Sequence, residues 1–245
     1  MADKIREIAL DTETTGLSPE SGDRVVEIGC VELLGHAPTG KSYHVYINPE
    51  RAVPEGAFNV HKLTDNFLAD KPKFAEVADG LLAFVGESTI IAHNASFDIE
   101  FLNMELKRCG RGPLSYDRVL DTLELARRKL PHLGSHRLDA LCKYYGVDNS
   151  ERRDAHGGYI DARILAEVYI ELIGGKEVDF FKSSSSVDEE KKAEEIHTRV
   201  ITEVKYIREA VRADVEALAP DDVAVGLNDE LRLWRMETRS EGLSD

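Results

Sequence analysis

Two carboxylates interrupt a stretch that otherwise has the pattern of a buried strand. The segment IALDTETTGL, residues 8–17, places Asp11 and Glu13 two positions apart among apolar and β-branched residues. On a strand, residues i and i+2 face the same side, so these side chains point together, about 7 Å apart along the chain. Like charges at such spacing raise each other's pKa unless a cation lies between them. The segment therefore indicates either a cation site or an edge strand whose acids face water.

The surrounding pattern indicates an α/β domain with a mixed sheet. Apolar and β-branched runs predict strands over 5–12, 24–34, 41–48 and 89–94, a loop over 35–40, and a strand running into a helix over 118–130. Helical spacing predicts helices over 73–87, 97–110, 135–146 and 159–175. Gly110 and Gly146 are expected to end their helices, and Ser135 to cap the helix that follows it. Three early strands followed by alternating helices and strands are typical of this fold class.

The composition changes after residue 175. The stretch GGKEVDFFKSSSSVDEEKK, residues 174–192, consists largely of Gly, Ser and charged residues, which is typical of a linker. Apolar residues then recur every three or four positions over 196–218, which predicts an amphipathic helix, and Trp234 lies beyond it. We therefore expect a catalytic domain over 1–175, a linker over 176–190 and a helical segment over 191–245. An apolar seam of this kind fits a partner protein, an intramolecular contact or a coiled coil.

Charge and cysteine content bound the function classes. The chain has 245 residues and a formal net charge of −15, which disfavours generic nucleic-acid binding unless acids hold cations that reverse the local charge. Its three cysteines, Cys30, Cys109 and Cys142, are far apart and are expected as free thiols in a reducing cytoplasm. The sequence contains no run of about eighteen apolar residues, so no membrane span is expected. Residues 1–10 do not resemble a secretion signal.

Three later residues strengthen the cation interpretation. Asp98 follows a predicted strand at the start of a helix, where an acid can also simply complement the helix dipole. Asp161 lies among apolar residues of a predicted helix, and an acid there needs a partner. His156 is five residues earlier, so it does not share that helical face and is expected in the preceding loop. Together with Asp11 and Glu13, these side chains suit two Mg²⁺ or Mn²⁺ ions and a histidine general base.

The sequence resembles the DEDDh exonucleases in three motifs, LDTETTGL, HNASFD and HGGYIDA. The match is closer still to the proofreading subunit of bacterial DNA polymerase III, and it extends over roughly residues 5 to 175. The resemblance implies a ribonuclease-H-like exonuclease fold, with a mixed five-stranded sheet flanked by helices, and release of 5′-mononucleotides from a single-stranded DNA 3′ end. The C-terminal extension after a linker, with its apolar seam, favours a subunit that this tail tethers to a polymerase catalytic subunit.

The resemblance assigns roles residue by residue. It implies metal ligation by Asp11, Glu13, Asp98 and Asp161, with His156 as the general base and Asp98 as a second catalytic group. It implies substrate contacts by Glu13, Thr14, Glu55, His61 and Asp161. Glu55 departs from the family pattern, because Gly56 occupies the place of the family's wedge glutamate. Without the resemblance, His61 would be read as a histidine in a surface loop.

The sequence also fits two other functions. The same chemistry fits an RNA-trimming DEDDh exonuclease, and an inactive nuclease fold could act as a binding module. The segment KEVDFF, 176–181, lies where relatives carry a sliding-clamp peptide, although it begins with Lys where a Gln is expected. Arg152 and Arg153 are candidates for contacts with DNA phosphates, while a solvated basic surface is the simpler interpretation.

Overall fold

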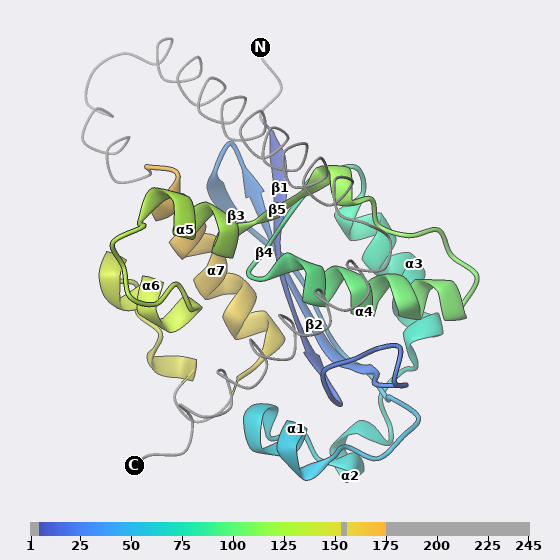
Figure 1. Ribbon diagram of the computed structural model, residues 1–245. Coiled ribbons are helices and arrows are strands. Elements are labelled where there is room, and N and C mark those ends of the chain that lie inside the picture. The colour runs from blue at the N-terminus through green and yellow to red at the C-terminus, as the bar shows by residue number, and fades with distance from the viewer. Residues whose placement is uncertain (1–4, 153–155, 175–245) are drawn as a thin grey trace, which may run out of the picture. The chain divides into compact units, whose positions relative to one another are not determined.

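The computed structural model describes residues 5–152 and 156–174 (Figure 1). The strands are β1 (Arg6–Thr14), β2 (Val25–Leu34), β3 (Ala37–Tyr46), β4 (Thr89–Ala92) and β5 (Val119–Asp121). The α-helices are α1 (Glu55–His61), α2 (Asp65–Leu68), α3 (Phe74–Val85), α4 (Ala95–Arg108), α5 (Thr122–Lys129), α6 (Leu138–Tyr145) and α7 (Gly158–Leu172), with short 3-10 turns η1 (Tyr116–Arg118) and η2 (Ser150–Arg152).

The five strands form one mixed sheet in the order β3-β2-β1-β4-β5. The first three strands pair antiparallel, whereas β1, β4 and β5 pair parallel. The predicted mixed five-stranded sheet is therefore confirmed. Because β1 lies at the centre of the sheet, the interpretation of Asp11 and Glu13 as acids on an edge strand is wrong.

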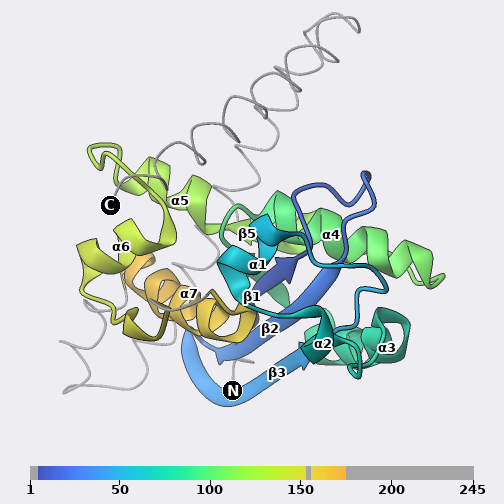
Figure 2. The same cartoon turned by 90° about the horizontal axis from the view of Figure 1, so that it is seen from below.

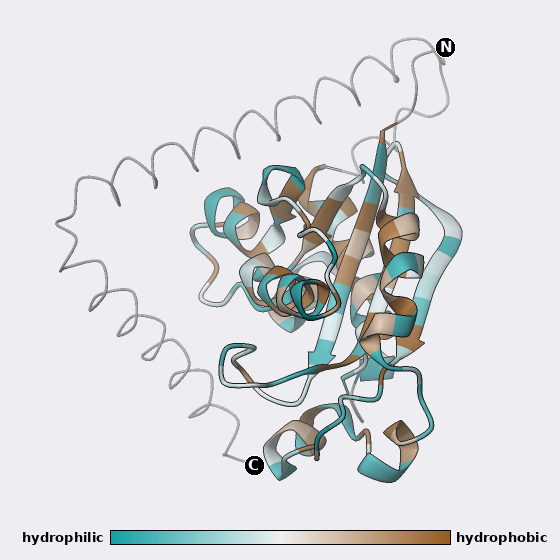
Figure 3. Ribbon diagram, turned by 90° about the vertical axis from the view of Figure 1, so that its right-hand side faces the viewer, coloured by the Kyte–Doolittle hydropathy of each residue, from teal (hydrophilic) through white to brown (hydrophobic). Residues whose placement is uncertain are grey.

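Helices cover both faces of this sheet (Figure 2). The main core cluster joins residues of α3 and α4 to Ile8 and Leu10 of β1 and to Ile90 of β4. On the other face, α7 packs across β1 and β2, and α5 and α6 pack against α7. Figure 3 shows the apolar segments of the central strands lying between these helices. Alternation along β1 therefore sends Ile8, Leu10 and Thr12 towards α4, and Asp11 and Glu13 towards α7.

The structure corrects two local predictions and adds two short helices. Residues 35–40 are not a loop, because β2 and β3 join through a two-residue turn at Gly35 and His36, both with positive φ. Such a turn matches the twist of a hairpin but lacks the usual Asn-Gly signature. Ser135 does not cap α6, whose N-cap is Arg137. The short helices α1 and α2 were not predicted, because seven and four residues are too few to show a clear period.

Other features agree with the sequence or lie outside the described residues. Gly146 ends α6 in the left-handed conformation, as predicted. Cys30 and Cys142 are buried, Cys109 is partly exposed, and each is a free thiol. Among the residues that the structure describes, no helix is long and apolar enough to cross a membrane. The linker over 176–190 and the helical segment over 191–245 lie outside the described residues.

Candidate active site

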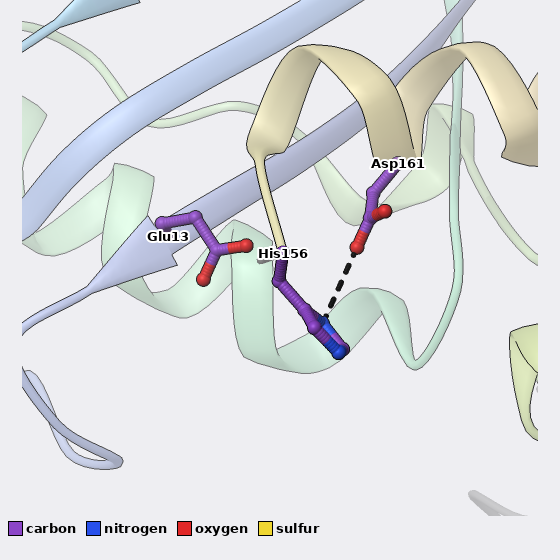
Figure 4. Close-up of side chains that lie close together, drawn as sticks. All are labelled: Glu13, His156 and Asp161. Atoms are coloured by element: carbon purple, nitrogen blue, oxygen red, sulfur yellow. Dashed lines mark ion pairs between the residues drawn. The ribbon is translucent and has the colours of Figure 1, made fainter. Parts of the chain in front are cut away.

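The end of β1 and the start of α7 bring two acids and a histidine together (Figure 4). Glu13 is near the end of β1, and Asp161 is in the first turn of α7. His156 lies in the loop just before α7, where the sequence placed it. Each of these residues offers one potential ligand atom, and the three atoms lie within 4.8 Å of one another. This donor set fits a divalent cation that accepts oxygen and imidazole ligands.

The charges around this cluster favour a bound cation. Burial and the neighbouring charges of Asp98, Asp161 and Glu13 raise the pKa of Asp11 well above its usual range. The pKa of Glu13 is raised in the same way, by burial and then by Asp161. Burial also raises the pKa of Asp161, which is 2% exposed. A bound cation lowers the free-energy cost of keeping several neighbouring acids ionised at neutral pH.

Asp98 reaches the same end of β1 from the opposite face of the sheet. It lies in the first turn of α4, and its Oδ1 accepts hydrogen bonds from the Thr12 backbone amide at 2.9 Å and the Thr12 hydroxyl at 2.7 Å. Burial raises the pKa of Asp98 to about 7, against the effect of these hydrogen bonds. The close set formed by Glu13, His156 and Asp161 does not include Asp11 or Asp98. The predicted residues thus share one end of β1, but they approach it from two faces.

Arg152 is neither part of a merely solvated basic surface nor free to meet DNA phosphates, because it is engaged with acids of the chain. Its Nε donates to Asp161 Oδ1 at 2.7 Å and its Nη1 to Asp139 Oδ1 at 2.6 Å. Its Nη2 lies 3.1 Å from His156 Nδ1. Burial and the Arg152 charge lower the pKa of His156, and Asp161 opposes this effect. At neutral pH the imidazole is therefore held in its neutral form, which a general base requires.

Two of the predicted substrate contacts, Glu55 and His61, lie at the two ends of α1. His61 ends α1 and is 3% exposed, so its interpretation as a surface-loop histidine is wrong. Its Nδ1 accepts a hydrogen bond from the Leu63 amide. Burial lowers the pKa of His61, and a hydrogen bond to the Thr14 backbone opposes this effect. The Thr14 hydroxyl donates to the Gly16 carbonyl, and Glu55 is exposed at the first position of α1. A backbone hydrogen bond from His156 to the Val60 carbonyl joins α1 to the loop before α7.

Two residues that support the site were not singled out from the sequence. Asp121 accepts hydrogen bonds from the backbone amides of Asn94 and Ala95, and so fixes the start of α4, three residues before Asp98. Glu27 of β2 lies directly opposite Glu13 in the sheet register. No sequence spacing links Glu27 to the motifs, because its proximity arises from strand pairing alone.

Comparison with known proteins places this geometry in a family. A family model described as an exonuclease (RNase_T) matches residues 8–169. The chain is 48% identical over 187 residues to the DNA polymerase III subunit epsilon of Rickettsia felis, covering 75% of this chain and 81% of that protein. It is 38% identical over 221 residues to the DNA polymerase III subunit epsilon of Escherichia coli K12, covering 87% and 90%.

Solved structures share the fold. The nuclease domain of 3′hExo, a DEDDh family member, superposes with a TM-score of 0.61 at 15% identity, covering 71% of this chain and 94% of that one. Exonuclease I superposes with a TM-score of 0.61 at 21% identity, covering 70% of this chain and 41% of that one. At these identities the likeness concerns the fold, which is the ribonuclease-H-like exonuclease fold that the sequence predicted.

Proposed function

The chain belongs to the exonuclease family, and from this premise we propose that it is the 3′→5′ proofreading exonuclease of a replicative DNA polymerase. It hydrolyses the terminal phosphodiester of a DNA 3′ end and releases a 5′-mononucleotide. One observation supports this most strongly: the acids Glu13 and Asp161 converge with His156 in a chain that is 48% identical to a polymerase III epsilon subunit.

Divalent metal binding is typical of this fold, and the acidic cluster supports two Mg²⁺ or Mn²⁺ ions. Asp11, Glu13 and Asp161 would hold the first ion, and Asp11 and Asp98 would hold the second or its waters. When bound, such ions stabilise the attacking and leaving oxygens of a phosphodiester displacement. Hydrogen bonds from Thr12 orient the Asp98 carboxylate towards this end of β1.

His156 is proposed to take the proton of the attacking water. To accept it at Nε2, the ring must carry its other proton on Nδ1. Asp161 Oδ2, 3.5 Å from Nδ1, favours that tautomer, whereas a hydrogen bond donated by Arg152 to Nδ1 favours the other. His156 is partly exposed, so a water can approach its ring. The balance between Arg152 and Asp161 therefore decides how much of the imidazole is ready to act as a base.

The DNA strand is proposed to enter beside α1. His61 and Glu55 lie at the ends of that helix, and the Thr14 backbone at the end of β1 is hydrogen-bonded to His61. The hydrogen bond from His156 to Val60 holds α1 against the catalytic loop. Glu55 is exposed at the first position of α1, where a DNA strand beside this helix could reach it.

The partner and domain assignments are part of the same proposal. Residues 1–175 form the exonuclease domain, residues 176–190 a linker, and residues 191–245 the segment that binds the polymerase catalytic subunit. A tether raises the effective concentration of the nuclease at the primer end, which an acidic protein binds weakly by itself. Contact between 176–181 and a sliding clamp would be weak, and the cytoplasm is the proposed location.

A substrate comparison tests the proposal. The purified chain is given single-stranded DNA and RNA of the same sequence, labelled at the 5′ end, with Mg²⁺ or Mn²⁺. We expect stepwise shortening of DNA from the 3′ end, faster at a mismatched terminus than at a paired one. Preferential shortening of RNA would instead identify an RNA-trimming exonuclease, and no hydrolysis with either metal would indicate a binding module.

A further inference from the structure

Two groups of side chains, each made of one Glu, one His and one Tyr, hold α7 against the sheet. One lies near each end of the helix. At its first turn, Glu27 Oε1 lies 2.8 Å from His44 Nε2, and the His44 ring stacks on Tyr159 with centroids 5.1 Å apart. Near its last turn, Glu7 accepts a hydrogen bond from the Tyr169 hydroxyl at 2.6 Å and lies 2.8 Å from His36 Nδ1. We call these the site-end trio (Glu27, His44, Tyr159) and the distal trio (Glu7, His36, Tyr169).

The site-end trio replaces a missing helix cap. The N-cap of α7 is Gly157, which has no side chain to accept a hydrogen bond from the first free amides of the helix. Glu27 reaches from β2 instead, and its Oε1 accepts from the Tyr159 amide at 3.4 Å. A carboxylate at this place also complements the positive end of the helix dipole. The Glu27 side chain is 3% exposed, so little water competes for these contacts.

The same carboxylate is a neighbour of the acidic cluster. Glu27 pairs with Glu13 in the register of β1 and β2, so both side chains project to the face covered by α7. Burial, Asp161 and then Glu27 raise the pKa of Glu13. Glu27 is thus linked to Glu13 across the sheet, and through the first turn of α7 to His156 and Asp161.

We infer that the Glu27–His44 pair is a positioning device that fixes the start of α7, and with it His156 and Asp161, relative to Glu13 for binding of the catalytic cation. The inference rests on the proposed metal-dependent function. Neither residue touches the reacting atoms, and both act through the residues they hold in place. Groups that orient metal ligands in this way typically change metal affinity or activity by about 10- to 100-fold when they are replaced.

The distal trio provides a matched control. Glu7→Gln removes the same charge from a buried Glu–His–Tyr group on the same helix, but at the end remote from His156 and Asp161. The test measures the Mn²⁺ dissociation constant of the full chain by calorimetry, with the melting temperature and kcat on single-stranded DNA. Glu27→Gln should weaken Mn²⁺ binding by about 10- to 100-fold and lower kcat. Glu7→Gln should lower the melting temperature and bind Mn²⁺ as the unaltered chain does.

A second variant separates position from charge. His44→Phe keeps an aromatic ring against Tyr159 and keeps the Glu27 charge, but removes the partner that orients this carboxylate. It should also weaken Mn²⁺ binding, and it carries the test if Glu27→Gln does not fold. Unchanged Mn²⁺ affinity in His44→Phe, or an equal loss in Glu7→Gln, would overturn the inference. If the unaltered chain neither binds Mn²⁺ nor shortens DNA, the proposed function fails first, independently of these variants.

Discussion

Gly29 of β2 and Gly158 of α7 meet backbone to backbone where the helix crosses the sheet. A Cβ placed on Gly29 would lie 2.2 Å from the Gly158 carbonyl oxygen, and Gly158 in turn faces the Asp11 carbonyl. This contact lets the first turn of α7 approach β1 closely enough for Asp161 to lie near Glu13. The separation of the catalytic side chains therefore depends on two residues that have no side chain.

Gly29→Ala is expected to damage both the fold and the site. The new methyl group meets rigid backbone, so α7 must move, and overpacking of this kind costs about 1–3 kcal/mol. The loss of nuclease activity should be larger than the fall in the free energy of unfolding explains, because the shift separates Asp161 from Glu13. Chemical unfolding and a single-stranded DNA assay measure the two effects. Gly112→Ala, where a Cβ would meet nothing within 4 Å, is the control and should behave as the unaltered chain.

Asp11→Asn should abolish hydrolysis of DNA. It should not lower the stability of the fold when stability is measured with a chelator present. The pKa of Asp11 is raised by burial and by neighbouring acids, so its charged form opposes folding when no cation compensates it. The neutral isostere removes that repulsion, and the melting temperature in EDTA should stay equal or rise. Asp79→Asn, at an exposed acid paired with Arg111, should leave activity intact. Full activity of Asp11→Asn would argue against the metal assignment.

His156→Ala should lower kcat by a factor of about 10² to 10⁴, the usual contribution of a general base. The pH–rate profile should also lose the ionisation assigned to this imidazole. Its ring lies within ligand distance of Glu13 and Asp161, so Mn²⁺ calorimetry is needed alongside kinetics. Retained Mn²⁺ affinity identifies a base, whereas a matching loss of affinity identifies a ligand.

Stability should fall on acidification because of His93. Burial lowers the pKa of His93 to about 4, from an ordinary value near 6.5. Between these values the unfolded chain binds a proton that the folded chain does not, so acidification favours unfolding by up to about 3 kcal/mol. His93→Asn, which can keep the hydrogen bond to Thr122, should show a shallower loss between pH 6.5 and 4. Above pH 7 the variant and the unaltered chain should have the same pH slope, and identical slopes below pH 6 would contradict the prediction.

A chain ending at Gly175 should keep its activity on free single-stranded DNA. Helix α7 ends at Leu172, so the cut leaves every described helix and strand in place. The shortened chain should lose association with the polymerase catalytic subunit and the gain in rate that tethering provides. Pull-down and primer-end assays measure both properties. Undiminished polymerase binding, or unfolding of the shortened chain, would show that the tail does not act as the tether.

The elements and the order of the motifs could be predicted from the sequence because they depend on local periodicity. The two-residue repeat placed Asp11 and Glu13 on one face of β1, and the four acids and His156 could be recognised by motif. The sequence also predicted the mixed sheet and the loop position of His156. The short helix α1 was missed, because seven residues carry too little periodic signal.

Tertiary structure alone decided which of these groups meet and what supports them. The sheet order placed β1 at the centre, and the packing of α4 and α7 on opposite faces brought Asp98 to β1 from one side and Asp161 from the other. The engagement of Arg152 with Asp161, and the position of Glu27 opposite Glu13, arise from contacts between segments that the sequence does not order in space. Periodicity determines which way a side chain points within its own element, whereas distances between elements depend on how close their backbones can pack, here through Gly29 and Gly158.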